Sequence, residues 1–328
     1  MNLTGIHLGS YWMGKNDVVY LMAQELSRSG KVDLVDTQIY ADNTSGWYRE
    51  EILEGHTFAV RWIDDNKLKK LVASYCPDYL IVNAGGMAIT KESSLWLRRR
   101  GVVSVGIELS DPDVFVDNGS LYSQYFDLYY TNSLYSLKAQ YPHEAKYKWL
   151  PFAAAPTLHR PLPKVSKEYD VVVVGHARPD RVKVVNNLKK YFKVGTFGNG
   201  WGSDSLEVHG ESHVRAINSG KIYLSFAQTY AGYNNVKVGF FEAAACKTCI
   251  LTAFTEEMPP LFSYGIDVVG YNSESSLLKA IRYYLHNPTA REWIAENSYR
   301  RTLREHTWEI RWKEVLRDVT NIKKSRRA

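Results

Sequence analysis

The stretch that decides the fold is YDVVVVGHARPDR, residues 169–181. Its four consecutive valines closed by a glycine are typical of a strand that is buried on both faces. A proline and two arginines follow, and we expect a helix over residues 181–192. A buried strand that leads into a helix predicts a mostly parallel sheet with helices on both faces, and the rest of the chain shows the same alternation.

The alternation is already present in the first half of the chain. The predicted strands there are residues 3–9, 32–39, 78–83, 102–108, 128–131 and 146–150. The predicted helices are residues 17–29, capped by Asn16, 61–74 and 91–99, whereas residues 40–57 are expected to be polar and irregular.

A segment with four prolines, PFAAAPTLHRPLPK at residues 151–164, interrupts the alternation and predicts an extended linker. We therefore expect a domain of residues 1–155, a domain of residues 156–307 and a C-terminal helix with a basic tail over residues 308–328. The further strands predicted in the second half are residues 194–197, 221–226 and 248–252, and the further helices are 236–246, 274–286, 289–304 and 308–322.

Composition narrows the class of protein. Apolar residues make up 45% of the chain and charged residues 23%, which is ordinary for a globular protein. No apolar run approaches the roughly 18 residues of a membrane span, and no signal peptide is recognisable. The three cysteines suit a reducing compartment, so a cytoplasmic location is expected.

The net charge of +6 is unevenly distributed. Residues 1–160 carry −2 and residues 161–328 carry +8, half of it in Lys323, Lys324, Arg326 and Arg327. Such a tail is most often a solvated end, and it can also bind anionic lipid or nucleic acid.

The candidate ligand-binding residues lie just after strands, where open α/β sheets bind their ligands. After the strand at 221–226, the loop AQTYAGYNN leads into a helix whose N-terminal amides can bind an anion. Glu242 lies about two turns into this helix. A carboxylate there can bind a diol such as ribose, or it can pair with a neighbouring base. The candidates are Gly232, Tyr233, Asn234, Asn235, Lys237 and Glu242.

Two further loops of the second half carry candidates. Arg178 and Arg181 can neutralise a diphosphate, or they can form a solvated first helical turn. Trp201, in FGNGW, offers a face for a base or simply packs.

The first half carries glycine-rich loops and an acidic loop. HLGSYWMGKN contributes Gly9, Ser10 and Gly14, and NAGG contributes Gly85 and Gly86. GIELSDPDVF places Glu108, Asp111 and Asp113 after a strand, where one can act as a general base and the others can form a turn. No metal site is expected, and zinc at His209 and His213 is disfavoured because the pair flanks Gly210.

An ordered set of segments resembles the CgeB-like (spore maturation protein type) branch of the glycosyl transferases group 1. The resemblance covers about residues 169–318 and includes YDVVVVG, FGNGW, HVRAINSGKIYLSF, NNVKVGFFEAAACKTCILT, the stretch LFSYGIDVVGYNSESSLLKAIRYYLHNPTAREWIA and REHTWEIRW. It implies the GT-B fold, with two Rossmann-like doubly wound domains facing a central cleft and a C-terminal helix that crosses back to the first domain.

The resemblance also implies a function. The second domain would bind a nucleotide-sugar, most simply a UDP-sugar, and the first would bind the acceptor, a glycan, lipid or small molecule. Glu242 would bind the donor ribose, the amides after Asn234 would meet the diphosphate, and Arg178 or Arg181 would offset the leaving-group charge. No metal or other cofactor is required in this class.

The chain departs from the family pattern at two positions. Asn234 stands where related enzymes often have an acid, and Lys247 replaces the usual glycine after Ala-Cys. Three alternatives stay open at this stage: a nucleotide-sugar epimerase, a transferase that acts on hydroxymethylated DNA, and a non-catalytic protein that binds nucleotide-sugars or nucleic acid.

Overall fold

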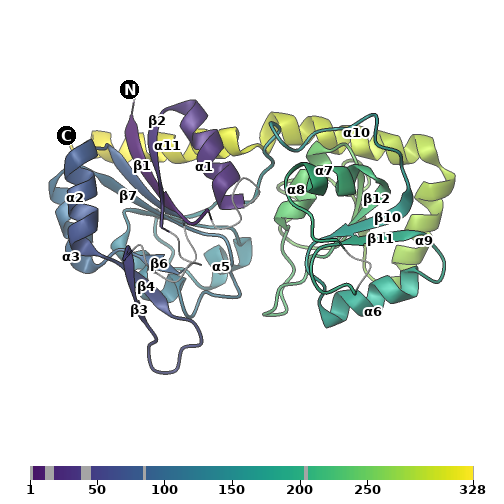
Figure 1. Ribbon diagram of the computed structural model, residues 1–328, viewed down its shortest axis with the longest axis horizontal. Helices are drawn as coiled ribbons and strands as arrows, with labels where there is room; N and C mark the ends of the chain where they lie inside the picture. Colours follow the sequence, from purple (N-terminus) through teal and green to yellow (C-terminus); the bar gives the residue numbers. More distant parts are fainter. Residues whose placement is uncertain (1–2, 12–17, 38–45, 84–85, 203–205, 328) are drawn as a thin grey trace. The chain divides into compact units, whose positions relative to one another are not determined.

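The computed structural model describes residues 3–11, 18–37, 46–83, 86–202 and 206–327. The chain forms two compact units (Figure 1). Unit 1 contains Met1–Pro151 and Trp308–Ala328, and unit 2 contains Phe152–Thr307. Each unit is built on a parallel sheet with helices on both faces, as the alternation of strands and helices predicts.

The sheet of unit 1 has six strands in the order β2-β1-β5-β7-β8-β9, and every pairing is parallel. Ile6 and Leu8 point to one face, where they pack with Leu80 and Val82 in the main core of the unit. The strands are β1 Thr4–Gly9, β2 Lys31–Asp36, β5 Tyr79–Asn83, β7 Val103–Glu108, β8 Leu128–Thr131 and β9 Tyr147–Trp149.

Helices α2 (Asp65–Tyr75) and α3 (Lys91–Arg99) cover this core face through Leu68, Val72 and Leu97. Helices α1 (Val18–Ser29) and α11 (Trp308–Ser325) pack against each other on the other face. The shorter helices are α4 Gly119–Tyr122, the 3₁₀ turn Ser123–Tyr125 and α5 Leu134–Ala139. The predicted cap Asn16 lies outside the described residues.

The prediction for residues 40–74 is partly wrong. Strand β3 (Tyr48–Glu51) pairs antiparallel with β4 (Val60–Ile63), which in turn pairs with β6 (Met87–Ala88). The residues at 61–63 therefore belong to a strand, and α2 begins only after Asp64, whose carboxylate accepts from the Lys67 amide at 2.8 Å. The polar sequence of β3 concealed this strand, because much of its surface is exposed.

Helix α11 belongs to unit 1 although it follows unit 2 in sequence, so the predicted return of the C-terminal helix is confirmed. The Trp312 indole is fully buried and donates to the Met22 carbonyl at 2.8 Å. The basic tail is not simply solvated: Lys323 pairs with Asp78 at 2.5 Å, and Arg326 pairs with Asp127 at 2.6 Å.

The sheet of unit 2 has five parallel strands in the order β11-β10-β12-β13-β14. Its strands are β10 Tyr169–Val174, β11 Val194–Phe197, β12 Gly220–Ser225, β13 Cys249–Ala253 and β14 Val269–Tyr271. Helices α6 and α9 pack on one face, and α7 and α8 pack on the other (Figure 1). The helices are α6 Pro179–Leu188, α7 Glu211–Asn218, α8 Val238–Ala245, α9 Glu274–His286 and α10 Pro288–Glu305.

Several boundaries in unit 2 differ from the prediction. Helix α6 starts at Pro179, because proline fits the first turn of a helix, and it ends at Leu188. Helix α7 and strand β14 were not predicted. Residues 151–164 form no helix and no regular strand, yet Phe152, Ala153, Ala154 and Ala155 are buried rather than exposed as in a free linker.

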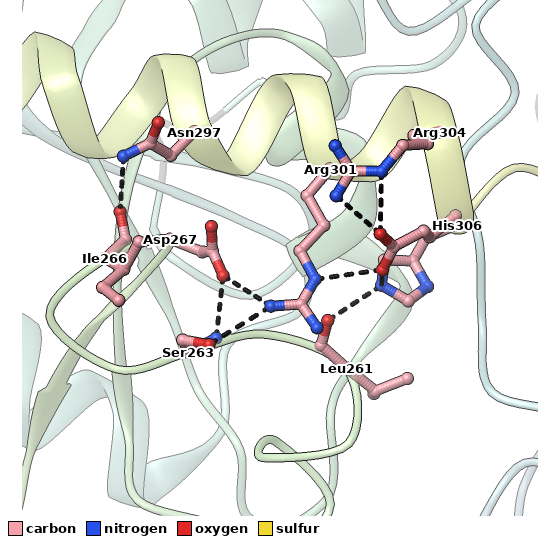
Figure 2. Close-up of polar contacts among 9 residues, drawn as sticks. Leu261, Ser263, Ile266, Asp267, Asn297, Arg301, Arg304 and His306 are labelled. Atoms are coloured by element: carbon pink, nitrogen blue, oxygen red, sulfur yellow. Dashed lines mark hydrogen bonds and ion pairs between the residues drawn. The ribbon is translucent and has the colours of Figure 1, made fainter.

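The loop between β13 and β14 is fastened to α10 by side chains of that helix (Figure 2). Arg301 donates to Asp267 at 2.8 Å, and Asn297 donates to the Ile266 carbonyl at 3.2 Å. His306, which follows α10, donates from Nε2 to the Leu261 carbonyl at 2.9 Å. The loop is thereby held in one position beside the carboxyl ends of the strands.

No helix in the described part of the chain combines the length and the apolarity needed to cross a membrane.

Candidate functional site

The strand order of unit 2 places its switch point next to β10. The chain leaves β10 for β11 on one side and returns to β12 on the other. Loops that follow strands on both sides of a switch point leave a crevice at the carboxyl edge of the sheet. The loop with Arg178 follows β10, and the loop at 226–237 follows β12, so the sequence-predicted donor residues meet here.

The loop after β12 folds into a tight hairpin. The Thr229 amide donates to the Tyr233 carbonyl at 2.7 Å, and Gly232 turns the chain with φ of +86°, where a side chain would be strained. Gln228 pairs with Asn234 as an antiparallel bridge. Tyr233 is 38% exposed at the tip, and the Asn234 carboxamide donates to the Phe254 carbonyl at 3.3 Å.

Arg178 joins the two loops. Its guanidinium donates to the carbonyls of Gln228 at 3.1 Å and Thr229 at 3.3 Å and pairs with Asp180 at 3.1 Å. The same group lies 4.3 Å from the centre of the Tyr230 ring. Arg181 donates to the His176 carbonyl at 2.9 Å. Both cations are therefore held at the carboxyl edge of the sheet and are not part of a freely solvated turn.

The backbone amides that are available to bind an anion begin further along the chain than the position after Asn234 that was predicted. The Asn235 amide donates to the Ala227 carbonyl, and the Val236 amide donates to the Glu257 carboxylate at 2.9 Å. Lys237 is the cap residue of α8 and forms no side-chain cap bond. The first-turn amides of α8, at Val238 and Gly239, have no partner within the helix.

Glu242 lies one turn further along α8 and is only 8% exposed. One carboxylate oxygen is 2.9 Å from His213 Nε2, and the other is 3.4 Å from His159 Nε2. The predicted alternative, that Glu242 pairs with a neighbouring base, is thus what the structure shows. A carboxylate oxygen has two lone pairs, so Glu242 can still accept a ligand hydroxyl beside each histidine.

The pKa values of the two histidines are shifted in opposite directions. Burial lowers the pKa of His159 and outweighs the attraction of Glu242, so its imidazole is neutral at pH 7. Burial also opposes the charge on His213, but Glu242 overcomes it and raises the pKa of His213. Burial would raise the pKa of Glu242, yet the histidines lower it to about 2. Both imidazoles therefore stabilise the carboxylate, His159 at 3.4 Å and His213 also through the hydrogen bond of 2.9 Å.

These three residues also form the one group of potential metal ligands in the described part of the chain, with their ligand atoms within 4.8 Å of one another. The hydrogen bonds of His159 argue against that use. The Ala155 amide donates to its Nδ1 at 3.2 Å, so the proton of the neutral ring lies on Nε2. A protonated Nε2 donates to Glu242 and has no lone pair for a metal.

We predict that the stabilisation contributed by His213 is lost at high pH. A raised pKa means that the folded protein binds the proton more tightly than the unfolded chain does. The contribution is complete below the unfolded value of 6.5 and disappears as the pH rises through the higher folded value. Urea unfolding of the wild type and His213→Gln at several pH values measures this, and a difference in stability that stays constant above pH 6.5 contradicts it.

Trp201 packs against the sheet rather than standing open for a base. Its Nε1 donates to the Gly175 carbonyl at 2.7 Å, and its ring lies against the hydrophobic core of unit 2.

In unit 1 the predicted loop residues lie at the carboxyl edge of the sheet. Gly9 ends β1, and Ser10 is buried directly after it. Gly86 adopts φ of +70°, and its carbonyl accepts from the Arg61 amide at 2.8 Å. Gly14 and Gly85 lie outside the described residues.

Glu108 and Asp111 are buried beside each other and hold the acidic loop. Glu108 accepts from the amides of Leu109 and Ser110, both at 2.9 Å. Asp111 accepts from the hydroxyls of Thr131 at 2.6 Å and Tyr141 at 2.9 Å. Burial is the main cause that raises the pKa of Glu108 to about 7 and of Asp111 to about 6.

Asp113 is less buried than these two residues, and its amide donates to the Ser110 carbonyl at 3.0 Å. The turn interpretation therefore fits part of this loop, while the raised pKa values keep two carboxyls near the range of a general base.

Sequence reasoning missed His159 and the role of His213. The signal for His213 was the spacing of Val214 and Ile217, which marks α7 as an amphipathic helix. Nothing near His159 in the sequence indicates its partner, which lies 83 positions later.

The fold is that of the GT-B glycosyltransferases, as the resemblance implied. Sucrose-phosphate synthase (tll1590) from Thermosynechococcus elongatus is similar over 98% of this chain and 100% of its own, with 12% identity and a TM-score of 0.66. Anabaena Alr3699/HepE in complex with UDP-glucose covers 97% of this chain and 99% of its own, with 11% identity and a TM-score of 0.63. A glycosyltransferase from Rickettsia africae ESF-5 covers 98% and 99%, with 10% identity and a TM-score of 0.62.

At the level of sequence, residues 178–317 match a family described as "Glycosyl transferase-like". This segment contains Arg178, the loop after β12, His213 and Glu242. No curated protein matches the chain.

Proposed function

We propose that this protein is a glycosyltransferase that moves a sugar from a UDP-sugar to a hydroxyl group of an acceptor. The observation that carries the proposal is the match of residues 178–317 to a glycosyl transferase-like family on a chain with the GT-B fold. The matched segment contains the switch-point loops, where this fold class binds nucleotides. UDP is the nucleotide of choice because the Anabaena structure holds UDP-glucose.

In this reaction the bond between the anomeric carbon and the diphosphate breaks, and its electron pair leaves with the diphosphate. The acceptor oxygen forms the new bond and loses its proton. Glu242 would accept the ribose hydroxyls, and the first-turn amides of α8 with Arg178 and Arg181 would offset the leaving-group charge without a bound metal. Unit 1 would bind the acceptor, with Glu108, Asp111 or Asp113 as a base.

A panel of UDP-, GDP- and dTDP-sugars tests the proposal. Binding is measured by calorimetry and turnover by the release of free nucleotide diphosphate. We expect at least one UDP-sugar to bind and to be slowly hydrolysed in the absence of an acceptor. If no nucleotide-sugar binds to the folded protein, the proposal is wrong.

Replacing Arg178 by alanine is expected to weaken UDP-sugar binding by about 10- to 100-fold, because one charge-assisted hydrogen bond contributes roughly 1.5–3 kcal/mol. Arg178→Lys should recover only part of the loss, since an ammonium cannot reproduce the planar contacts to two carbonyls. Arg100→Ala removes an arginine of unit 1 whose guanidinium lies over Trp96 and serves as the control. Wild-type affinity in Arg178→Ala would remove this residue from the donor site.

A further inference from the structure

We propose that unit 2 has a second binding site, a pocket for a neutral saccharide, between α6, α9 and the carboxyl ends of β12, β13 and β14. We call it the saccharide pocket. Its volume is about 460 Å³, within the range of roughly 300–1,000 Å³ that is typical of small-molecule sites. The ligand class builds on the proposed function, because a glycosyltransferase acts on sugars.

The saccharide pocket and Glu242 lie on opposite faces of the sheet. Val184 of α6 and Leu277 of α9 line the pocket together with Phe226, which directly follows β12. Glu242 belongs to α8, which packs on the other face of the sheet. This packing is close, because a Cβ at Gly239 of α8 would come within 2.4 Å of the hydroxyl of Tyr223 in β12. The pocket therefore lies away from the carboxylate that we assign to the ribose, and it shares only Asn234 with the predicted donor residues.

Phe254 supplies an aromatic face at the pocket. The residue is 48% exposed, although its ring also packs closely against neighbouring residues. Its ring centre lies 4.6 Å from that of Tyr264, and its ring edge packs over Gly270, where a Cβ would approach it to 2.5 Å. Tyr264 belongs to the loop between β13 and β14 that Arg301 and Asn297 of α10 hold through Asp267 and Ile266. A rigid, exposed ring of this kind can stack on the C–H face of a sugar.

The polar groups of the pocket suit hydroxyls. Gln228, Asn234 and Asn272 line the pocket with carboxamides, and Ser273 lines it while its hydroxyl caps α9. Asp180 uses Oδ1 for Arg178, and Glu274 uses Oε1 for Asn187 at 2.5 Å. Within the described part of the chain, no contact involves Asp180 Oδ2 or Glu274 Oε2. These two oxygens are acceptors for sugar hydroxyls.

The charges of the pocket exclude an anionic ligand. The lining contains Asp180 and Glu274 but no lysine, arginine or histidine. The neighbouring cations Arg178 and Arg181 are directed at backbone carbonyls of the switch-point loops. A phosphate or diphosphate would meet Glu274, whose partner is the neutral Asn187 amide, and Asp180, which already pairs with Arg178, whereas an uncharged polyol would meet no such repulsion.

Saturation-transfer NMR on the full chain tests the inference with maltotriose, cellotriose and mannotriose as neutral probes and glucose 1-phosphate as the anionic probe. We expect at least one trisaccharide to bind in the presence of saturating UDP and glucose 1-phosphate not to occupy this pocket. Phe254→Ala should weaken that binding by about 3- to 10-fold, which is what an aromatic stacking contact contributes. UDP affinity should change by less than about twofold.

Two further variants act as controls. Phe254→Leu keeps apolar bulk without an aromatic face and should also lose affinity, and Trp293→Ala removes a half-exposed ring on α10 and should have no effect. The inference is overturned if no trisaccharide binds, if UDP displaces the trisaccharide, or if Phe254→Leu binds as the wild type does. Saccharide binding without UDP binding would refute the proposed donor and leave the pocket standing.

Discussion

Replacing Glu242 by glutamine is expected to weaken UDP-sugar binding by about 10- to 100-fold. Glutamine keeps the size of the side chain, but it removes the charge that makes its bonds to ribose hydroxyls strong. Hydrogen bonds to a charged group contribute roughly 1.5–3 kcal/mol, which corresponds to this range. Glutamine also cannot accept from both histidines, because one of its two groups is a donor. Calorimetry with the UDP-sugar that binds the wild type measures the loss.

The control for Glu242 is Glu25→Gln. Glu25 is also a buried glutamate, 7% exposed, and it pairs with Arg28 in unit 1. Its replacement should leave UDP-sugar affinity unchanged. A thermal melt of both variants shows that they are folded at the temperature of the measurement. Equal affinity in Glu242→Gln and the wild type would exclude a role of this carboxylate in donor binding.

Replacing Trp312 by alanine is expected to destabilise unit 1 by about 3–5 kcal/mol, the usual cost of removing a fully buried tryptophan. The ring is 0% exposed, and its indole N–H satisfies the Met22 carbonyl of α1. The variant leaves a cavity between α1 and α11 and removes the hydrogen bond from the indole to the Met22 carbonyl. The C-terminal helix then loses one of its buried apolar side chains, while Trp308, Val315 and Val319 remain.

Urea unfolding measures this loss, and the transition of each unit is followed separately because a chain with two units need not unfold in one step. Trp293→Ala is the matched control, since this tryptophan is 51% exposed on α10 and its removal should change stability by less than about 0.5 kcal/mol. A loss below about 1 kcal/mol in Trp312→Ala would show that the buried Trp312 ring contributes little to holding α11 on unit 1.

The sequence predicted the elements whose pattern is local. Helices α3 and α9 and strands β8 and β11 begin and end at the predicted residues. Apolar periodicity, caps and turn residues are all properties of neighbouring positions, so a single sequence contains them. Strands β3 and β4 were missed for the same reason, because each has only four residues and neither shows a clear apolar alternation: β3 is mostly polar, and the apolar residues of β4 stand at its two ends and at Trp62.

The candidate site was predictable only in part. Arg178 and the loop around Asn234 were found because they follow strands, and the edge of a parallel sheet collects such loops. The partners of Glu242 were not found, because they come from distant parts of the chain. His213 reaches Glu242 through the packing of α7 on α8, and His159 reaches it from the segment before β10.

By itself, the sequence predicted two mostly parallel α/β sheets and the loops that face their carboxyl edges, and the family resemblance implied the helix that returns to unit 1. The tertiary structure alone decided that Glu242 is a buried carboxylate between two histidines, that the basic tail is paired with Asp78 and Asp127, and that Phe254 stands exposed beside a cavity. The physical reason is that backbone elements follow from short-range patterns, whereas the charge and exposure of a side chain depend on groups that the fold brings from distant parts of the chain.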